Sequence, residues 1–166
     1  MMRKLAILFP LLFLSAFLNV LTAQVVGVGV NEQPLTAKEK AEAATKLTVE
    51  KVLKYAQARN YESLGRIALY AGREPNRTMK MKVNMMDSYE RLELENTCNF
   101  IHHLLEKTVI WNATNFRIVN AVNEKYYYWD IEFTDDKMKT KVFTMLLGEL
   151  KGEFLFARFE KKGTVK

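Results

Sequence analysis

Apolar residues in the first part of the chain recur every three or four positions, a spacing that places them along one side of a helix. Thr36 is followed by Glu39 in a capping-box pattern, so a long helix is expected to begin there and to run to about Arg59. Its predicted core positions are Leu47, Val49, Val52, Leu53 and Ala56. The lysines between these positions are expected to face the solvent.

The same spacing predicts two more helices. Asn60 interrupts the first helix, and a short second helix is expected to follow it and to end before Gly72. Asp87 with Glu90 is another capping box, which is expected to open a third helix that runs to about Lys107. The core positions of the third helix are Leu94, Cys98, Ile101 and Leu105.

Other segments alternate apolar and polar residues, which is typical of strands with one buried face. Strands are predicted over 78–85, 116–122, 126–134, 139–147 and 153–160. Residues 112–115 are rich in turn-forming side chains and are expected to form a turn. The apolar face of 126–134, which is expected to lie in the core, carries Tyr127, Trp129, Ile131 and Phe133. Asp130 and Glu132 fall on the opposite face.

The predicted order of elements is α-α-β-α-β-β-β-β. This order predicts an α+β fold in which N-terminal helices pack on one face of a curved, mainly antiparallel sheet. A chain of 166 residues, 49% of them hydrophobic, fits a single domain, which we expect over residues 36–160. Residues 24–35 are expected to form a flexible leader, and residues 161–166 a polar tail.

Two short motifs and the element order resemble a known superfamily. The link between the first two helices, A-R-N-Y-E-S-L over 58–64, is similar to the "alanine, small residue, Asp/Asn, Tyr" link of the cone-shaped α+β superfamily named for nuclear transport factor two (NTF2). The last strand, G-E-F-L-F-A-R-F-E over 152–160, is similar to its "G-x-W-x-[IV]" closing strand, with Phe154 in the Trp position. The superfamily includes ketosteroid isomerase, scytalone dehydratase and SnoaL-like families, and the resemblance extends over about 36–160.

The resemblance implies a conical sheet whose concave face, closed by the helices, forms a pocket. It does not imply a reaction, because catalytic members carry a buried Asp, His or Tyr set in that pocket whereas many exported bacterial members have no assigned activity. A cystatin-like fold shares the helix-on-sheet architecture. Residues 24–28 (QVVGV), however, lack the last glycine of the cystatin motif Q-x-V-x-G.

Residues 1–23 have the layout of a cleaved signal peptide. Arg3 and Lys4 precede an uncharged apolar stretch over 5–21, and Ala23 offers a small residue at the cleavage site. We therefore expect export, to the periplasm or out of the cell, with no stable membrane span after cleavage. The alternative is an uncleaved anchor, because the stretch approaches the ~20 residues that span a bilayer. Cleavage removes two cations from a net charge of +6, which weakens the case for a polyanionic partner.

Composition narrows the chemistry further. Cys98 is the single cysteine, so an internal disulfide and a thiolate metal cluster are excluded, and its place on the apolar side of a predicted helix favours burial. His102 and His103 are adjacent, so on a helix their side chains diverge and lack the i, i+4 geometry of zinc-binding histidines. We predict neither a metal nor a cofactor.

Two residues are candidates for a catalytic base. Asp130 shares a strand face with Glu132 at a separation of about 7 Å, which suits an acid–base pair. His102 is the other candidate, because an imidazole in a pocket acts as a base near neutral pH. A competing interpretation pairs the two carboxylates with Lys139 and Lys141 of the next strand, as a charge ladder on a solvated sheet face.

Aromatic residues and methionines favour a binding role. The residues expected to line an apolar pocket are Tyr55, Met81, Trp129, Phe143 and Phe156. Consecutive tyrosines alternate between strand faces and the protein is expected to be exported, so nucleic acid is not an expected partner. The leading hypothesis is an exported, non-enzymatic domain that binds a small apolar ligand or a second copy of itself. Two alternatives remain open: an isomerase- or dehydratase-type enzyme that uses Asp130 or His102, and a structural envelope component.

Overall fold

The computed structural model describes residues 34–72, 74, 77, 79–121 and 124–162. From Leu35 onward these residues belong to one structural unit. The expected signal peptide, most of the expected leader and residues 163–166 of the expected tail lie outside the described residues. None of the helices in the described ranges is both long enough and apolar enough to cross a membrane.

The helices are α2 (Ala37–Gln57), α3 (Tyr61–Arg66) and α4 (Ser88–Glu106). Both predicted helix starts are confirmed: the Thr36 hydroxyl accepts a hydrogen bond from the backbone N–H of Glu39 (3.2 Å) in a capping box, and Asp87 accepts one from the backbone N–H of Glu90 (3.0 Å). These bonds satisfy amide groups that the first turn of a helix leaves unpaired. The predicted second box is not completed, because the Glu90 carboxylate accepts from the backbone N–H of Asn84 (2.8 Å) instead. Leu47, predicted as a core position, is instead 58% exposed.

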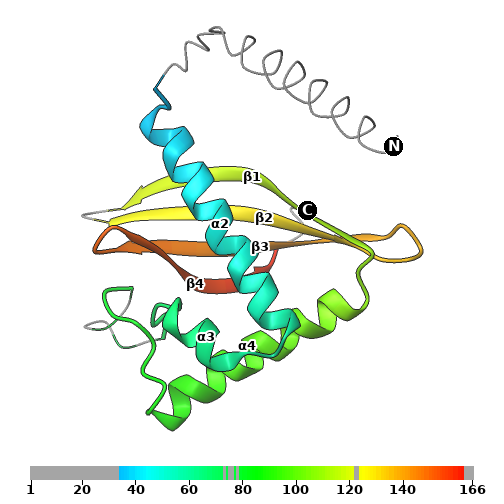
Figure 1. Cartoon of the computed structure of the whole chain (residues 1–166), viewed down its shortest axis with the longest axis horizontal. Helices are drawn as coiled ribbons and strands as arrows, with labels where there is room; N and C mark the ends of the chain where they lie inside the picture. The colour runs from blue at the N-terminus through cyan, green and yellow to red at the C-terminus, as the bar shows by residue number, and fades with distance from the viewer. Residues whose placement is uncertain (1–33, 73, 75–76, 78, 122–123, 163–166) are drawn as a thin grey trace, which may run out of the picture. The chain divides into compact units, whose positions relative to one another are not determined.

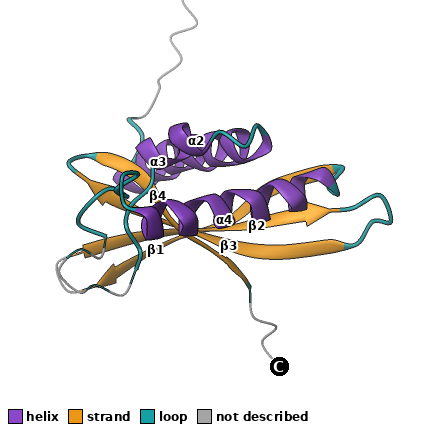
Figure 2. Cartoon of the chain, turned by 90° about the horizontal axis from the view of Figure 1, so that it is seen from below, coloured by secondary structure: helices purple, strands orange, loops and turns teal. Residues whose placement is uncertain are grey.

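The strands are β1 (Ile110–Ala121), β2 (Glu124–Thr134), β3 (Thr140–Leu150) and β4 (Glu153–Lys161). They pair in sequence order, each antiparallel to the next. Figure 1 shows α2 crossing the sheet, and Figure 2 shows all three helices on the same side of it. The predicted α+β fold, with helices on one face of an antiparallel sheet, is therefore confirmed.

The core lies between the helices and this face of the sheet. The four residues of β2 that were predicted to face inward, Tyr127, Trp129, Ile131 and Phe133, are 0–4% exposed. They pack against Val49, Val52 and Ala56 of α2, and against Leu94, Cys98 and Ile101 of α4. The Trp129 indole Nε1–H donates to the hydroxyl of buried Thr45 (3.0 Å), so α2 and β2 share a polar contact inside an apolar layer.

One strand prediction and one turn prediction were wrong. Residues 79–85 form no strand of the sheet; this segment pairs with residues 68–70 through an isolated bridge between Lys82 and Leu69 and through backbone hydrogen bonds. Residues 112–115 form no turn but belong to β1, where the pairing with β2 shifts between Thr114 and Arg117. The turn-forming residues are accommodated at this β-bulge, where β1 contains more residues than the paired part of β2. Asn115 has a left-handed backbone conformation there (φ 51°).

The β4 edge of the sheet is covered by the segment after α3. Ala68 forms a parallel bridge with Phe156, and the Leu69 N–H donates to the Phe156 carbonyl (2.6 Å). Leu69 and Met79 then pack over Gly148 of β3, where a Cβ atom would lie 2.7 Å and 3.0 Å from their side chains. A glycine at this position therefore permits the close approach of the segment to the sheet.

Candidate functional site

The helices leave the other face of the sheet uncovered over most of its area, and we call this surface the open face. Its side chains include those of Arg117, Val119, Tyr126, Tyr128, Asp130, Glu132, Val142, Thr144, Leu146, Arg158 and Glu160, as the strand register places them. Within it, Asp130 is unusual, because its side chain is 0% exposed although it lies on the side of the sheet that no helix covers.

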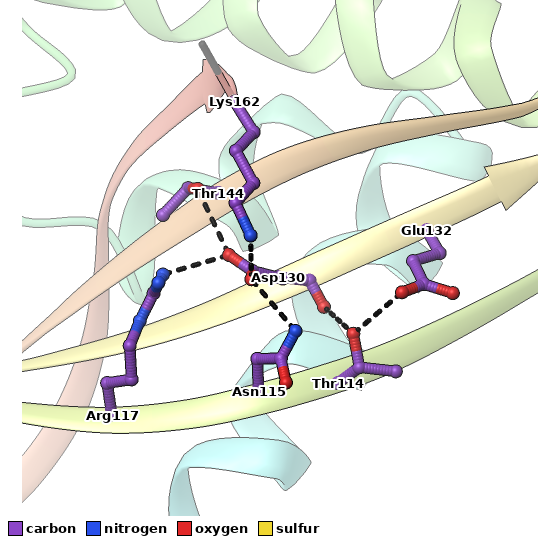
Figure 3. Close-up of polar contacts among 7 residues, drawn as sticks. All are labelled: Thr114, Asn115, Arg117, Asp130, Glu132, Thr144 and Lys162. Carbon is purple, nitrogen blue, oxygen red and sulfur yellow. Dashed lines mark hydrogen bonds and ion pairs between the residues drawn. The ribbon is translucent and has the colours of Figure 1, made fainter. Parts of the chain in front are cut away.

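Asp130 is buried under the polar side chains that surround it (Figure 3). One carboxylate oxygen accepts hydrogen bonds from the Arg117 guanidinium (2.9 Å) and the Thr144 hydroxyl (3.3 Å). The other accepts from the Lys162 ammonium group (2.6 Å) and the Asn115 amide (3.2 Å). The two cations remain 46% and 40% exposed. Four donors, two of them charged, therefore bind a single buried carboxylate.

Each donor reaches Asp130 for a local structural reason. Thr144 is directly opposite Asp130 in the β2–β3 pairing. The bulge in β1 turns Asn115 toward the carboxylate and sets Arg117 opposite Tyr128, whose ring lies 5.9 Å from the guanidinium carbon. Lys162 follows β4, and its backbone N–H continues the ladder by donating to the Val142 carbonyl (3.1 Å).

The surroundings of Asp130 favour its charged form. Burial by itself would raise the pKa of this carboxyl group, but the hydrogen bonds from Lys162 and Asn115 and the charge of Arg117 together lower the pKa from its usual value of 3.8. Asp130 is therefore a carboxylate at neutral pH. Its oxygens are occupied by donors that are themselves held by the sheet, so it has little capacity to accept a proton from a substrate.

Glu132 does not form an acid–base pair with Asp130. It accepts a hydrogen bond from the Thr114 hydroxyl (3.1 Å), which also lies 3.4 Å from the Asp130 carbonyl. The expected charge ladder with Lys139 and Lys141 is absent from the described structure, since Asp130 is paired with Arg117 and Lys162 instead. The carboxylates were correctly placed on one face, but the cations that pair with Asp130 come from β1 and from the residue after β4.

His102 lies on α4, on the side of the sheet that the helices cover. Its Nδ1 is 3.2 Å and 3.0 Å from the carbonyl oxygens of Ala56 and Gln57, which end α2, and its Nε2 is 3.1 Å from the Glu106 carboxylate. His102 thus connects the end of α2 to α4. The two candidate bases lie on opposite faces of the sheet and do not form a common site.

The other histidine also has a local partner, since the Nδ1 atom of His103 lies 2.9 Å from Glu106. In the described part of the chain, no three His, Cys, Asp or Glu side chains are grouped so that they could hold a metal ion.

The five expected pocket residues do not form one wall. Trp129, Phe143 and Phe156 are 2–3% exposed and belong to the packed core. Tyr55 is half-buried at the margin of that core, and Met81 is 51% exposed outside it.

The sequence reasoning missed the partners of Asp130. Arg117 and Lys162 are 13 and 32 residues away from it along the chain. The contact of Arg117 could have been predicted from the sequence, because a polar residue in a strand next to β2 is expected to lie on the same face of the sheet as Asp130. Lys162 lay in the expected polar tail, and Asn115 in the expected turn. Neither had a local pattern that predicted its contact.

Comparison with known proteins gives little further information. No protein-family model and no curated protein matches the chain. A search of solved structures finds a designed NTF2-like protein, with 12% sequence identity and a TM-score of 0.44; the match covers 74% of this chain and 99% of that protein. The helices followed by an antiparallel meander are consistent with the superfamily that the sequence resembles.

Proposed function

We propose that this domain is an exported interaction module that uses the open face of its sheet to bind a second copy of itself. The observation that carries the proposal is the composition of this face. Half-buried Tyr126, Tyr128 and Leu146, and Val119 at 46% exposure, lie beside cations that a buried carboxylate holds in place. Tyrosine and arginine are enriched at the centres of protein interfaces, where aromatic and guanidinium groups bury large areas.

The charges of the open face favour a partner of the same kind. Its cations include Arg117, Arg158 and Lys162, and its anions include Asp130, Glu132 and Glu160. In a two-fold symmetric dimer the same surface faces itself, so a surface of one sign would repel its copy. A face that carries charges of both signs reduces this repulsion and allows ion pairs across the interface.

The two candidate bases support binding rather than catalysis. Asp130 is ionised and has four hydrogen-bond donors, while both ring nitrogens of His102 contact carbonyl or carboxylate oxygens. Both residues have structural partners that account for their positions. Export, the other part of the proposal, rests on the pattern of residues 1–23. N-terminal sequencing of the secreted protein is expected to begin at Gln24.

The interface is tested by sedimentation equilibrium of the purified protein and of the variant Val119→Glu. Val119 is an exposed residue of the open face. In the dimer, a carboxylate at this position therefore faces either the same carboxylate of the second copy or an apolar surface. We expect a dimer for the unchanged protein. The dissociation constant of the variant is expected to rise by about tenfold or more, since one buried, unpaired charge costs at least that much.

The matched control is Leu92→Glu, because Leu92 is similarly exposed (54%) but lies on α4, on the helix side of the sheet. This variant is expected to dimerise like the unchanged protein. A protein that is monomeric at every concentration contradicts the proposal. So does a dimer that Leu92→Glu dissociates and Val119→Glu leaves intact.

A further inference from the structure

A groove lies at the end of the sheet where β1 ends, β2 begins and β3 leads into β4; in Figure 1 these strand ends are at the left. Its volume is about 610 Å³, which is within the range of sites for small molecules and too small for a folded partner. It adjoins the proposed interface and shares Tyr126 with it, and it differs from the core between the helices and the sheet.

The groove has an apolar floor. Gly148 contributes no side chain, and Leu69 and Met79 fill the space above it, with side-chain atoms 2.7 Å and 3.0 Å from the position that a Cβ would take. Ala121 and Leu150 complete the floor on the two sides. Methionine is flexible and polarisable, so it adapts to the shape of an apolar chain.

Cations surround this floor. Lys80, Lys125 and Lys151 are exposed lining residues, and none of the three has an ion-pair partner within the described residues. They come from three different segments, so they approach the groove from three sides. The Lys151 backbone is fixed by a two-residue turn between Leu150 and Glu153, in which Lys151 and Gly152 both have positive φ (53° and 81°).

The two carboxylates that line the groove have other partners. The Glu149 carboxylate accepts a hydrogen bond from the Tyr127 hydroxyl (2.9 Å), and the Glu124 carboxylate accepts one from the Tyr126 hydroxyl. Hydrogen bonding to these carboxylates and burial raise the pKa of both tyrosines to about 12, so the hydroxyls remain donors at neutral pH. The lysines exceed the carboxylates by one charge, and among the described residues their side chains have no ion-pair partner.

From this arrangement we infer that the groove binds a small anionic amphiphile: a molecule with an apolar chain and a single carboxylate head group. The chain lies on the floor formed by Met79, Ala121 and Leu150, and the head group is bound by the three lysines. An uncharged apolar molecule gains nothing from the lysines. A cationic amphiphile of the same length is repelled by them.

The test is isothermal titration of the purified protein with decanoate, and with decyltrimethylammonium as the probe of opposite charge. Decanoate is expected to bind saturably at one site, and decyltrimethylammonium is expected not to bind. Replacement of all three lysines (K80Q, K125Q and K151Q together) is expected to weaken decanoate binding about tenfold, because each exposed ion pair contributes a factor of roughly two to five.

Two variants separate shape from charge. Ala121→Trp fills the groove without changing its charge, and is expected to abolish saturable binding. The triple variant K40Q, K46Q and K54Q removes the same charge from exposed positions of α2 and is expected to change the affinity less than twofold. Circular dichroism confirms that each variant keeps its fold.

Three outcomes overturn the inference: no saturable decanoate binding, equal weakening by both lysine triples, or unchanged binding to Ala121→Trp. A fourth is binding to phosphatidylglycerol vesicles in the absence of decanoate binding, which assigns the lysines to a membrane surface instead. Decanoate binding does not require the dimer, and the sedimentation measurement uses no ligand, so the two proposals can fail separately.

Discussion

Most of the polar side-chain contacts described on the open face are made with Asp130. A carboxylate that is 0% exposed is stable only if its charge is matched, and here two cations and two neutral donors match it. Because Arg117 and Lys162 stay partly exposed, the network holds both cations at fixed positions and leaves them accessible from the solvent. The same residue therefore contributes to stability and positions the proposed contact surface.

The lowered pKa of Asp130 predicts how stability depends on pH. A group whose pKa is lower in the folded state stabilises the protein above its unfolded pKa, and this contribution disappears as the pH falls through the folded value. The free energy of unfolding, measured with urea at a series of pH values, is expected to lose this contribution below about pH 4.

Asp130→Asn is expected to be less stable at pH 7 by about 1–3 kcal/mol and to lose this part of the acid dependence. Glu132→Gln is the matched control, because Glu132 lies on the same strand and face but accepts a single side-chain hydrogen bond. Its effect is expected to be about 0.5 kcal/mol or less. Identical pH profiles for the unchanged protein and Asp130→Asn contradict the role of the network.

Cys98 was predicted to be buried, and it is 0% exposed. Burial raises the pKa of its thiol to about 11, and this effect outweighs the opposing charge of Arg59. The thiol is thus both protonated and shielded at neutral pH. We expect no reaction with a thiol reagent such as 5,5′-dithiobis(2-nitrobenzoate) in the native state and one equivalent in urea. Fast reaction of the Cys98 thiol in the folded protein would contradict its burial.

The contact between α2 and β2 depends on one hydrogen bond inside the core. Thr45→Val preserves the volume of the side chain but removes the acceptor of the Trp129 indole N–H. A buried donor without a partner costs about 1–3 kcal/mol, so this variant is expected to unfold at correspondingly lower urea concentration. Thr97→Val is the control, since the Thr97 hydroxyl bonds only within α4. Equal stability of the two variants contradicts a structural role for this bond.

Helices were more predictable than strands because their signals are local. Each helix start was predicted from two residues three positions apart, and in both pairs the first residue caps the helix by accepting from the backbone N–H of the second. The alternating methionines of 79–85 gave an equally regular signal, yet Met81 is 51% exposed. That segment covers the β4 edge through Lys82 and Leu69 and does not enter the sheet. Whether an alternating segment joins a sheet depends on the available pairing partners, which a local pattern does not contain.

For the same reason, the face on which Asp130 lies could be predicted from the sequence, but its burial and its partners could not. Period-two alternation correctly placed Asp130 and Glu132 on the face opposite Trp129. It did not predict burial, because burial comes from Arg117 and Lys162, which are distant in the sequence. Asn115 was assigned to a turn on its composition, whereas pairing with β2 extends β1 through it and makes a bulge.

At the scale of the whole molecule, the sheet separates two kinds of chemistry. The side toward the helices is an aromatic and aliphatic core in which Phe133, Phe143 and Phe159 contact one another at ring centroid distances of 5.1–6.2 Å. The open face combines tyrosines, aliphatic residues and charges of both signs. The proposed dimer uses the middle of this face, and the inferred amphiphile uses the adjoining groove at its end. Sedimentation tests the first proposal, and titration with decanoate tests the second.

The Asp130 network also has a consequence for the order in which the chain is made. Its members come from β1, β2, β3 and the residue after β4, so the network spans the sheet from its first strand to its last described residue. During synthesis, β1 and β2 leave the ribosome well before Lys162. In a nascent sheet, Arg117 is therefore the one cation of the network that can pair with Asp130. The Asp130 carboxylate gains its second cation only after Lys162 has left the ribosome.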